Sequence, residues 1–212
     1  HPDQFGKRYR LATAGDERIY ASAVDRLRKK LGNWPYLEKA LPNERVDTED
    51  HAVNRLPLYG MPSWKDAFNA RQRLGLFTFL QKIRSSDKRV REECDTILSH
   101  CAPHVDIDEL SQAVLGYLAV ILDRSADKGS MLARWNSAGE KIEATFSRQA
   151  LPMLWDFAEI NFFSGVNGDW TSNRDWVLRY IETNPSTHKR HHHQRPILLL
   201  LFRPTTHLAK QE

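Results

Sequence analysis

The sequence feature that most restricts the fold is an apolar stripe with helical spacing in residues 106–122. Its members recur at intervals of three and four residues, as on one face of an α-helix: Leu110, Val114, Tyr117, Leu118, Ile121 and Leu122. Asp106 or Asp108 is placed to begin this helix. An amphipathic stripe of this length has to be covered by other elements, so we expect the helix to lie in a core.

Further helices are predicted on both sides of this one. Capping residues and helical periods predict a helix at residues 16–31, with Asp16 as its cap and Gly32 at its end, and a helical region that begins after Ser63 and continues through 76–83. Two more helices are predicted at 86–101 and 150–159. The last begins at a Thr171 or Asn173 cap and runs through Ile181, with Trp176, Val177 and Tyr180 on its buried side. Residues 141–146 alternate apolar and polar side chains, which fits a short strand or a helix start. The long connection 33–60 is expected on the surface or against something absent from the chain. The predicted fold class is mainly α, with little or no sheet.

Charge divides the chain into a neutral body and a basic tail. The 212 residues carry a net charge of +4, but residues 184–212 hold five Lys or Arg and a single acid. Residues 1–183 are therefore neutral, and bulk charge alone does not predict DNA binding by the body. We expect two parts: residues 1–183 as a helical region, and residues 184–212 as a basic, His-rich tail that is disordered or non-native. No apolar run approaches the roughly 20 residues that span a bilayer, so no membrane is expected and the location predicted is cytoplasmic.

The cysteine and histidine residues predict neither a disulfide nor a metal site. Cys94 and Cys101 are seven residues apart on a predicted helix, a separation of about 10 Å. A disulfide requires Cα atoms within about 7 Å, so both are expected as free thiols. The H-x-x-H pair in the tail lacks a third ligand with fixed spacing, and a disordered basic tail is the favoured interpretation. No metal site is predicted.

The densest group of functional side chains is the run SRQALPMLWDFAEINFFSGVNGDW at residues 147–170. Within seven positions it contains Trp155, Asp156, Glu159 and Asn161. On the predicted helix 150–159, Asp156 and Glu159 share a face. An ordinary core helix has no need for this combination of aromatic and acidic groups.

This run resembles one in a family of large prokaryotic DNA methylases, often described as adenine-specific and usually carrying an N-terminal domain of unknown function. The family pattern is roughly F-x-R-Q-A-L-P-M-x-W-D-[FY]-x-E-x-N-x-F-S, before a catalytic D-P-P-Y. Other collinear motifs are similar to those of the family, and together they cover about residues 5–182: GKRYRLAT at 6–13, LYGM at 58–61, WKDAFNARQ at 64–72, LDR at 122–124, RWN at 134–136 and the stretch 140–146.

The resemblance implies that the chain is an internal piece of such an enzyme. The family holds S-adenosylmethionine with D-P-F-x-G-G-G and the target amine with D-P-P-Y, and neither motif occurs in the sequence. The intact enzyme would use S-adenosylmethionine and act on DNA, for example in restriction–modification or phage defence. The fragment alone is expected to bind no cofactor and to methylate nothing. It would pack on a Rossmann-like sheet supplied by the missing catalytic half of the same polypeptide.

The candidate residues for positioning DNA or the target base carry aromatic, acidic or guanidinium groups. They are Trp155, Asp156, Glu159, Asn161, Arg134, Trp135 and Arg148. Stacking and hydrogen bonds to a flipped base would require such groups. A purely structural interpretation stays open, in which the Trp side chains are packed, the carboxylates cap or pair with Arg134 or Arg148, and Arg148 pairs with an acid such as Glu159.

A second functional class also stays open: a non-enzymatic helical interaction module with Trp155, Trp170 and Trp176 as anchors. The fragment hypothesis makes a structural prediction of its own. Removal of the catalytic half would leave apolar surface exposed around residues 155–163.

Overall fold

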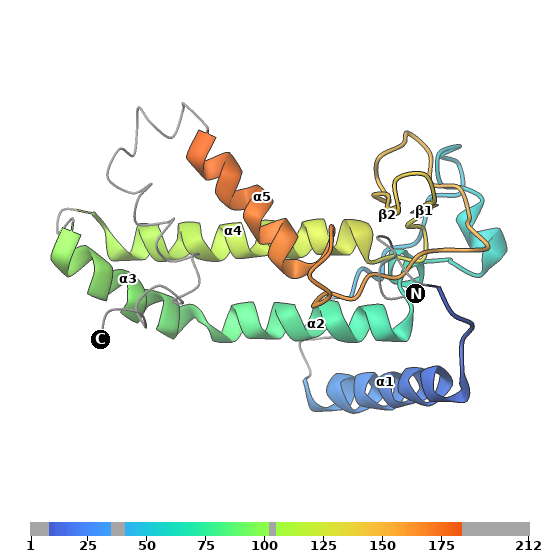
Figure 1. Cartoon of the computed structure of the whole chain (residues 1–212), viewed down its shortest axis with the longest axis horizontal. Helices are drawn as coiled ribbons and strands as arrows, with labels where there is room; N and C mark the ends of the chain where they lie inside the picture. The colour runs from blue at the N-terminus through green and yellow to red at the C-terminus, as the bar shows by residue number, and fades with distance from the viewer. Residues whose placement is uncertain (1–8, 35–40, 102–104, 184–212) are drawn as a thin grey trace, which may run out of the picture. The chain divides into compact units, whose positions relative to one another are not determined.

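The computed structural model describes residues 9–34, 41–101 and 105–183, and these residues are mainly helical (Figure 1). In chain order the elements are α1 Ala14–Asn33, the 3₁₀ turns η2 Leu56–Tyr59 and η3 Trp64–Ala67, α2 Ala70–Ser85, α3 Asp87–Cys101, α4 Ile107–Lys128, β1 Trp135–Asn136, β2 Lys141–Ile142 and α5 Trp170–Thr183. The residues form two compact units. Unit 1 contains the described residues up to Thr78 together with Ala126–Asn161, and unit 2 contains Phe79–Ser125 together with those from Phe162 onward.

Most of the predicted helices are confirmed, with small changes at their ends. Helix α1 begins at Ala14, so Asp16 is not its cap. Thr13 is the cap residue, and the Asp16 carboxylate accepts a hydrogen bond of 2.8 Å from the Thr13 amide. The last helix begins at Trp170 rather than after Thr171 or Asn173. Its cap is Asp169, whose carboxylate accepts from the Ser172 amide at 2.7 Å. In both cases an acidic side chain satisfies a free amide of the helix start.

The predicted helix 150–159 is wrong. The chain there is extended and irregular, because its amides donate to distant carbonyls instead of to the preceding turn. The Leu151 amide donates to Ala52 at 2.8 Å, and the Ala158 amide donates to Ala133 at 2.8 Å. Pro152 has no amide hydrogen to contribute to a helix. Asp156 and Glu159 therefore do not share a helical face.

The core of unit 1 is built largely from irregular segments. Its buried side chains come from the connection before α2, from η3 and from the two loops after α4: Val46, Val53, Leu56, Met61, Ala67, Leu132 and Leu151. The connection predicted to lie on the surface, or against something absent, thus supplies much of this core itself. The two-residue strands pair antiparallel in the register Trp135 with Ile142 and Asn136 with Lys141, which confirms the strand alternative for the start of residues 141–146.

The core of unit 2 lies among α3, α4 and α5, and α5 lies obliquely against α4 (Figure 1). Its buried members are Cys94, Leu98, Leu110, Val114, Ile121, Val177 and Ile181. They confirm Leu110, Val114 and Ile121 of the stripe predicted on α4, whereas Tyr117, Leu118 and Leu122 are partly buried. On α5 the prediction is confirmed for Val177, but Trp176 and Tyr180 are 52% and 57% exposed. The buried face of α5 carries Val177 and Ile181, so the residues one position earlier lie beside that face.

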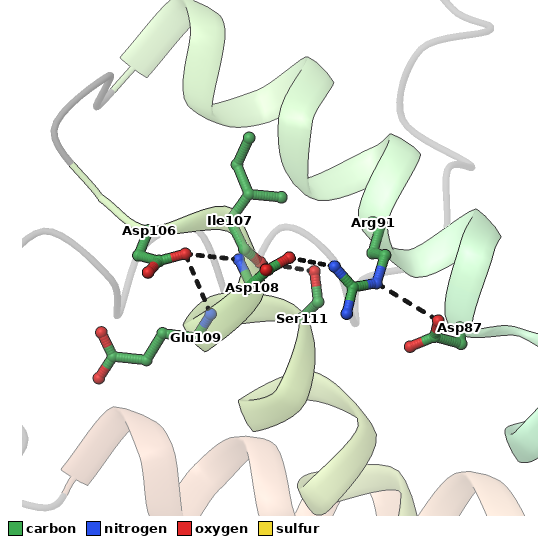
Figure 2. Close-up of polar contacts among 7 residues, drawn as sticks. All are labelled: Asp87, Arg91, Asp106, Ile107, Asp108, Glu109 and Ser111. Carbon is green, nitrogen blue, oxygen red and sulfur yellow. Dashed lines mark hydrogen bonds and ion pairs between the residues drawn. The ribbon is translucent and has the colours of Figure 1, made fainter.

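Polar contacts fix the start of α4 against α3 (Figure 2). Arg91 on α3 bonds to Asp108 of α4 and donates to Asp87 at 3.3 Å. The Asp106 carboxylate accepts from the Asp108 amide at 2.8 Å, which confirms it as a cap. Ser111 is buried and its hydroxyl donates to the Ile107 carbonyl at 2.6 Å. These groups satisfy one another, so we regard the cluster as structural.

Candidate functional site

The run from Leu151 to Asn161 projects one large aromatic side chain into solvent. The hydrogen bonds of Leu151 and Ala158 hold the run at two points, and Trp155 lies between them with 86% of its surface exposed. The Trp155 ring meets the edge of Tyr59 at a centroid distance of 6.1 Å and an interplanar angle of 78°. The chain thus presents a wide aromatic surface on a segment whose ends are fixed.

Residues of η2 extend this surface. Leu58 is 81% exposed and Tyr59 is 45% exposed. We name Leu58, Tyr59 and Trp155 the Trp155 surface. Gly60 ends η2 with a φ of +83°, and its amide donates to the Pro57 carbonyl at 3.2 Å. A left-handed residue at this point lets the chain turn inward to the buried Met61.

The prediction of exposed apolar surface around residues 155–163 is confirmed only in part. Phe163 is 79% exposed, whereas Ile160 and Phe162 are buried. Phe163 belongs to unit 2 and Trp155 to unit 1. Of the residues 155–163, Trp155 is therefore the strongly exposed apolar side chain that belongs to unit 1.

Glu159 lies at the end of the run and is engaged within unit 1. Arg71 donates to its carboxylate through Nε at 2.6 Å and through Nη2 at 3.0 Å, and Asn69 Nδ2 donates at 2.9 Å. The Arg71 guanidinium carbon also lies 5.6 Å from the ring centroid of Tyr20. The hydrogen bond to Glu159 raises the pKa of Arg71. The structural alternative, in which Arg148 pairs with an acid such as Glu159, is not realised at Glu159, because Arg71 binds that carboxylate.

The remaining candidates are less closely grouped. The backbone of Arg134 bridges that of Phe157, which brings the start of β1 to the run containing Trp155 and Asp156. Trp135 is half-buried, with its ring 6.3 Å from that of Tyr9. Asp156, Asn161 and the side chain of Arg134 are exposed.

Arg148 is also exposed, and in the described part of the chain it forms no ion pair. The sequence analysis gave no role to Tyr59, which belongs to the LYGM motif and whose ring contacts that of Trp155. The spacing of 96 residues between Tyr59 and Trp155 left no local signal of their contact.

A cleft of about 680 Å³ opens between α1 and the start of α2, within unit 1. Its surface is mainly apolar, and its lining residues include three arginines: Gly15, Arg18, Ile19, Ser22, Ala23, Arg26, Arg71 and Leu74. Arg71 lines this cleft and also binds Glu159. Arginine side chains over apolar surface suit an anionic ligand such as a phosphate.

Other kinds of site were sought among the described residues. There, no three His, Cys, Asp or Glu side chains come together in a way that would hold a metal ion. The His-rich tail lies outside those residues. In the same ranges, each helix is too short or too polar to traverse a lipid bilayer. The two-residue strands of the described chain provide no strand-turn-helix unit of the kind that holds S-adenosylmethionine.

Comparison with known proteins adds no relationship. No protein-family model, no curated protein and no solved structure matches the chain.

Proposed function

We propose that the chain is the helical central region of an S-adenosylmethionine-dependent DNA methyltransferase that modifies the exocyclic amine of adenine in the cytoplasm. In the intact enzyme this region would position DNA and the target base beside a Rossmann-like catalytic half. The proposal depends on one observation above the others: Trp155, in the run most similar to DNA methylases, is 86% exposed while the residues around it are held in place.

An exposed indole on a fixed segment suits a base that has left the duplex. Enzymes that modify a base extract it from the stack at a cost of about a few kcal/mol, and aromatic stacking offsets part of that cost. Asp156, next in the chain, is exposed and offers a carboxylate that accepts hydrogen bonds from an amine. Trp155 would stack on the base, and Asp156 would accept from its exocyclic amine.

The arginine-lined cleft supplies the second element of the proposal. Arg18 and Arg26 are two helical turns apart on α1 and both line the cleft, whereas the guanidinium of Arg71, the third lining arginine, is paired with Glu159. Phosphate contacts of this kind fix the register of a protein on DNA without reading sequence. The cleft would hold the DNA backbone while the Trp155 surface holds the base.

Catalysis would come from outside these residues. S-adenosylmethionine would supply the methyl group and would be held by the catalytic half of the enzyme. The missing glycine-rich and D-P-P-Y elements would belong to the flanking parts of the polypeptide. We therefore assign no chemical step to the residues of this chain, only the binding and orientation of DNA.

A helical interaction module is the competing function, and one observation favours it. Trp155 and Trp176 are both exposed, as anchors for a protein partner would be. Trp170, the third anchor predicted, is unsuitable because its ring stacks on Phe79 at 4.2 Å and 6°. A module of this kind would bind a protein and show no preference among DNA substrates.

The experiment is a titration of the chain with three fluorescent 20-base-pair duplexes. One is fully paired, one holds a mismatched adenine, and one holds an abasic site opposite the adenine. Because an unpaired base leaves the stack easily, we expect tighter binding to the second and third. Trp155→Ala should remove that preference, because losing one stacking contact weakens binding of the second and third duplexes by about 5- to 150-fold.

Phe146→Ala is the matched control, since Phe146 is a 61% exposed aromatic of the same unit, and it should leave the preference unchanged. Equal binding of all three duplexes, unaffected by Trp155→Ala, would overturn the proposal. Sequencing the flanking DNA gives an independent test, in which absence of both D-P-F-x-G-G-G upstream and D-P-P-Y downstream would contradict it.

A further inference from the structure

A second groove lies in unit 2, between α4 and α5. It has a volume of about 390 Å³ and is lined by Tyr117, Val120, Arg124, Trp176, Val177 and Tyr180. All six residues belong to unit 2. On α4 the lining follows the spacing i, i+3 and i+7, and on α5 Trp176 and Tyr180 are four residues apart, so each set forms one row along its helix.

The groove exposes more aromatic surface than a core-facing helix normally does. Trp176 and Tyr180 are more than half exposed, and Val120 on α4 is 46% exposed. This exposure follows from the packing of α5, because Val177 and Ile181 occupy the core in their place. Two neighbouring rings therefore remain available to a ligand on one side of α5.

Positive charge surrounds these rings. The guanidinium carbons of Arg124 and Arg179 lie 5.6 Å and 5.3 Å from the ring centroid of Trp176. Neither arginine forms an ion pair within the described ranges, whereas nearby Arg174 pairs with Asp175 at 2.7 Å. The Nε of Arg124 is also buried without a hydrogen-bond partner in the described chain. Arg124 thus lines the groove and Arg179 lies beside its Trp176 ring, and neither guanidinium is paired with a carboxylate of the described residues.

We propose that this groove binds single-stranded DNA, with a base stacked against Trp176 and Tyr180 and the adjoining phosphates on Arg124 and Arg179. Sequence-tolerant single-strand sites combine aromatic rings that accept a base with cations that follow the backbone. Guanidinium planes also stack on bases, so the arginines beside Trp176 extend the platform. An acidic peptide would satisfy the arginines but would leave the exposed rings without a matching partner.

This inference goes beyond the proposed function and does not rest on it. It concerns unit 2, whereas the proposed base-positioning surface belongs to unit 1. A methylase region and an interaction module could each contain such a groove. The experiments on Trp155 and on Trp176 therefore succeed or fail separately.

The test is fluorescence anisotropy of a labelled dT12 oligonucleotide with the full chain. We expect saturable binding that Trp176→Ala weakens by about 5- to 150-fold, the range for one lost stacking contact. Trp176→Phe keeps an aromatic ring and should retain most of the affinity. Arg179→Gln should reduce the slope of log K against log salt by about 0.7, as expected for one lost phosphate contact on a single strand.

Controls separate this groove from other binding surfaces. The basic tail is present in every variant, so its contribution cancels in the comparison. Phe146→Ala removes an exposed aromatic ring from unit 1 and should leave dT12 affinity unchanged. The proposal is overturned if dT12 does not bind, if Trp176→Ala binds as well as the natural chain, or if polyglutamate of equal length competes as strongly as unlabelled dT12.

Discussion

Arg71 and Glu159 are 88 residues apart in the chain and form a two-point ion pair, with contacts of 2.6 Å at Nε and 3.0 Å at Nη2. Glu159 is only 18% exposed in its side chain, and Asn69 donates a third hydrogen bond to it. The pair joins the first turn of α2 to the end of the run that carries Trp155. The position of the Trp155 surface therefore depends on this contact as well as on the backbone bonds of Leu151 and Ala158.

Replacing Glu159 should destabilise unit 1. Glu159→Ala leaves the donors of Arg71 and Asn69 without their acceptor, and we expect a loss of about 1–2 kcal/mol. This is below the cost of a fully buried pair because Arg71 is 43% exposed and water screens part of the interaction. Urea unfolding measures the change. Arg148→Ala is the control and should cost less than about 0.5 kcal/mol, as for an exposed residue; an equal cost for both would contradict the assignment.

The helices could be predicted from sequence because their information is local. The stripe on α4 repeats within one helix, and its buried members Leu110, Val114 and Ile121 were all expected in the core. The run at 151–160 could not be predicted in the same way. Its amides bond to Ala52 and Ala133, and those partners lie far away in the chain. Local spacing favoured a helix there, and non-local hydrogen bonding prevented it.

The arrangement of the candidate residues could not be predicted from the sequence. Trp155 and Asp156 were chosen as candidates by residue type, and both are exposed. Their grouping with Glu159 on a helix was wrong, and so was the partner of Glu159. The sequence does not show which distant carboxylate will form an ion pair with an arginine such as Arg71, because many acidic residues of equal charge are available to it.

Cys94 should be an unreactive thiol in the folded chain. It is fully buried, and burial raises its pKa above the ordinary value of 9.0, while a hydrogen bond with Ser111 opposes the rise. In a Cys101→Ser background, alkylation should be more than about 100-fold slower in the folded chain than in urea, because the thiol reacts only on opening. Reaction at the urea rate without denaturant would contradict the buried position.

The same shift predicts the direction of a pH effect on stability. A pKa raised by folding gives a contribution that is complete below the unfolded thiol pKa near 9 and is lost as pH rises above it. Urea unfolding at pH 8 and pH 10 should show this loss in the Cys101→Ser chain. The loss should shrink when Cys94 is also replaced by Ala.

Asp16 should make α1 sensitive to acid. Hydrogen bonds from Arg10, and then from the amide and hydroxyl of Thr13, hold the pKa of Asp16 well below its ordinary value of 3.8. A lowered pKa gives stabilisation that is present above 3.8 and is lost as pH falls below it. Asp16→Asn should reduce helical circular dichroism at pH 7 and remove the change between pH 5 and pH 2. Glu17→Gln, in the same first turn, is the control and should keep that change.

Two glycines should respond in opposite directions to alanine. Gly60 has a φ of +83° and Gly116 lies within α4, and an added Cβ meets nothing within 4 Å at either position. Backbone conformation alone therefore decides the sign. Gly60→Ala should cost about 1–2 kcal/mol because a left-handed residue with a side chain is strained. Gly116→Ala should gain about 0.5–1 kcal/mol in helix propensity. Thermal unfolding measures both, and equal signs would contradict the structure.

Asn173 should be a sensitive position of unit 2, because it is fully buried and joins α5 to α4. Its Nδ2 donates to Ser125 Oγ and to the Gly168 carbonyl, each at 3.1 Å. Asn173→Ala removes both bonds, and we expect a loss of about 1–3 kcal/mol in urea unfolding. Asn173→Asp should cost more, because a carboxylate oxygen would then face the Gly168 carbonyl and a charge would be buried without a partner. Thr171→Ala, an exposed change in the first turn of α5, is the control. If Asn173→Asp were no worse than this control, the buried contact between α4 and α5 would be excluded.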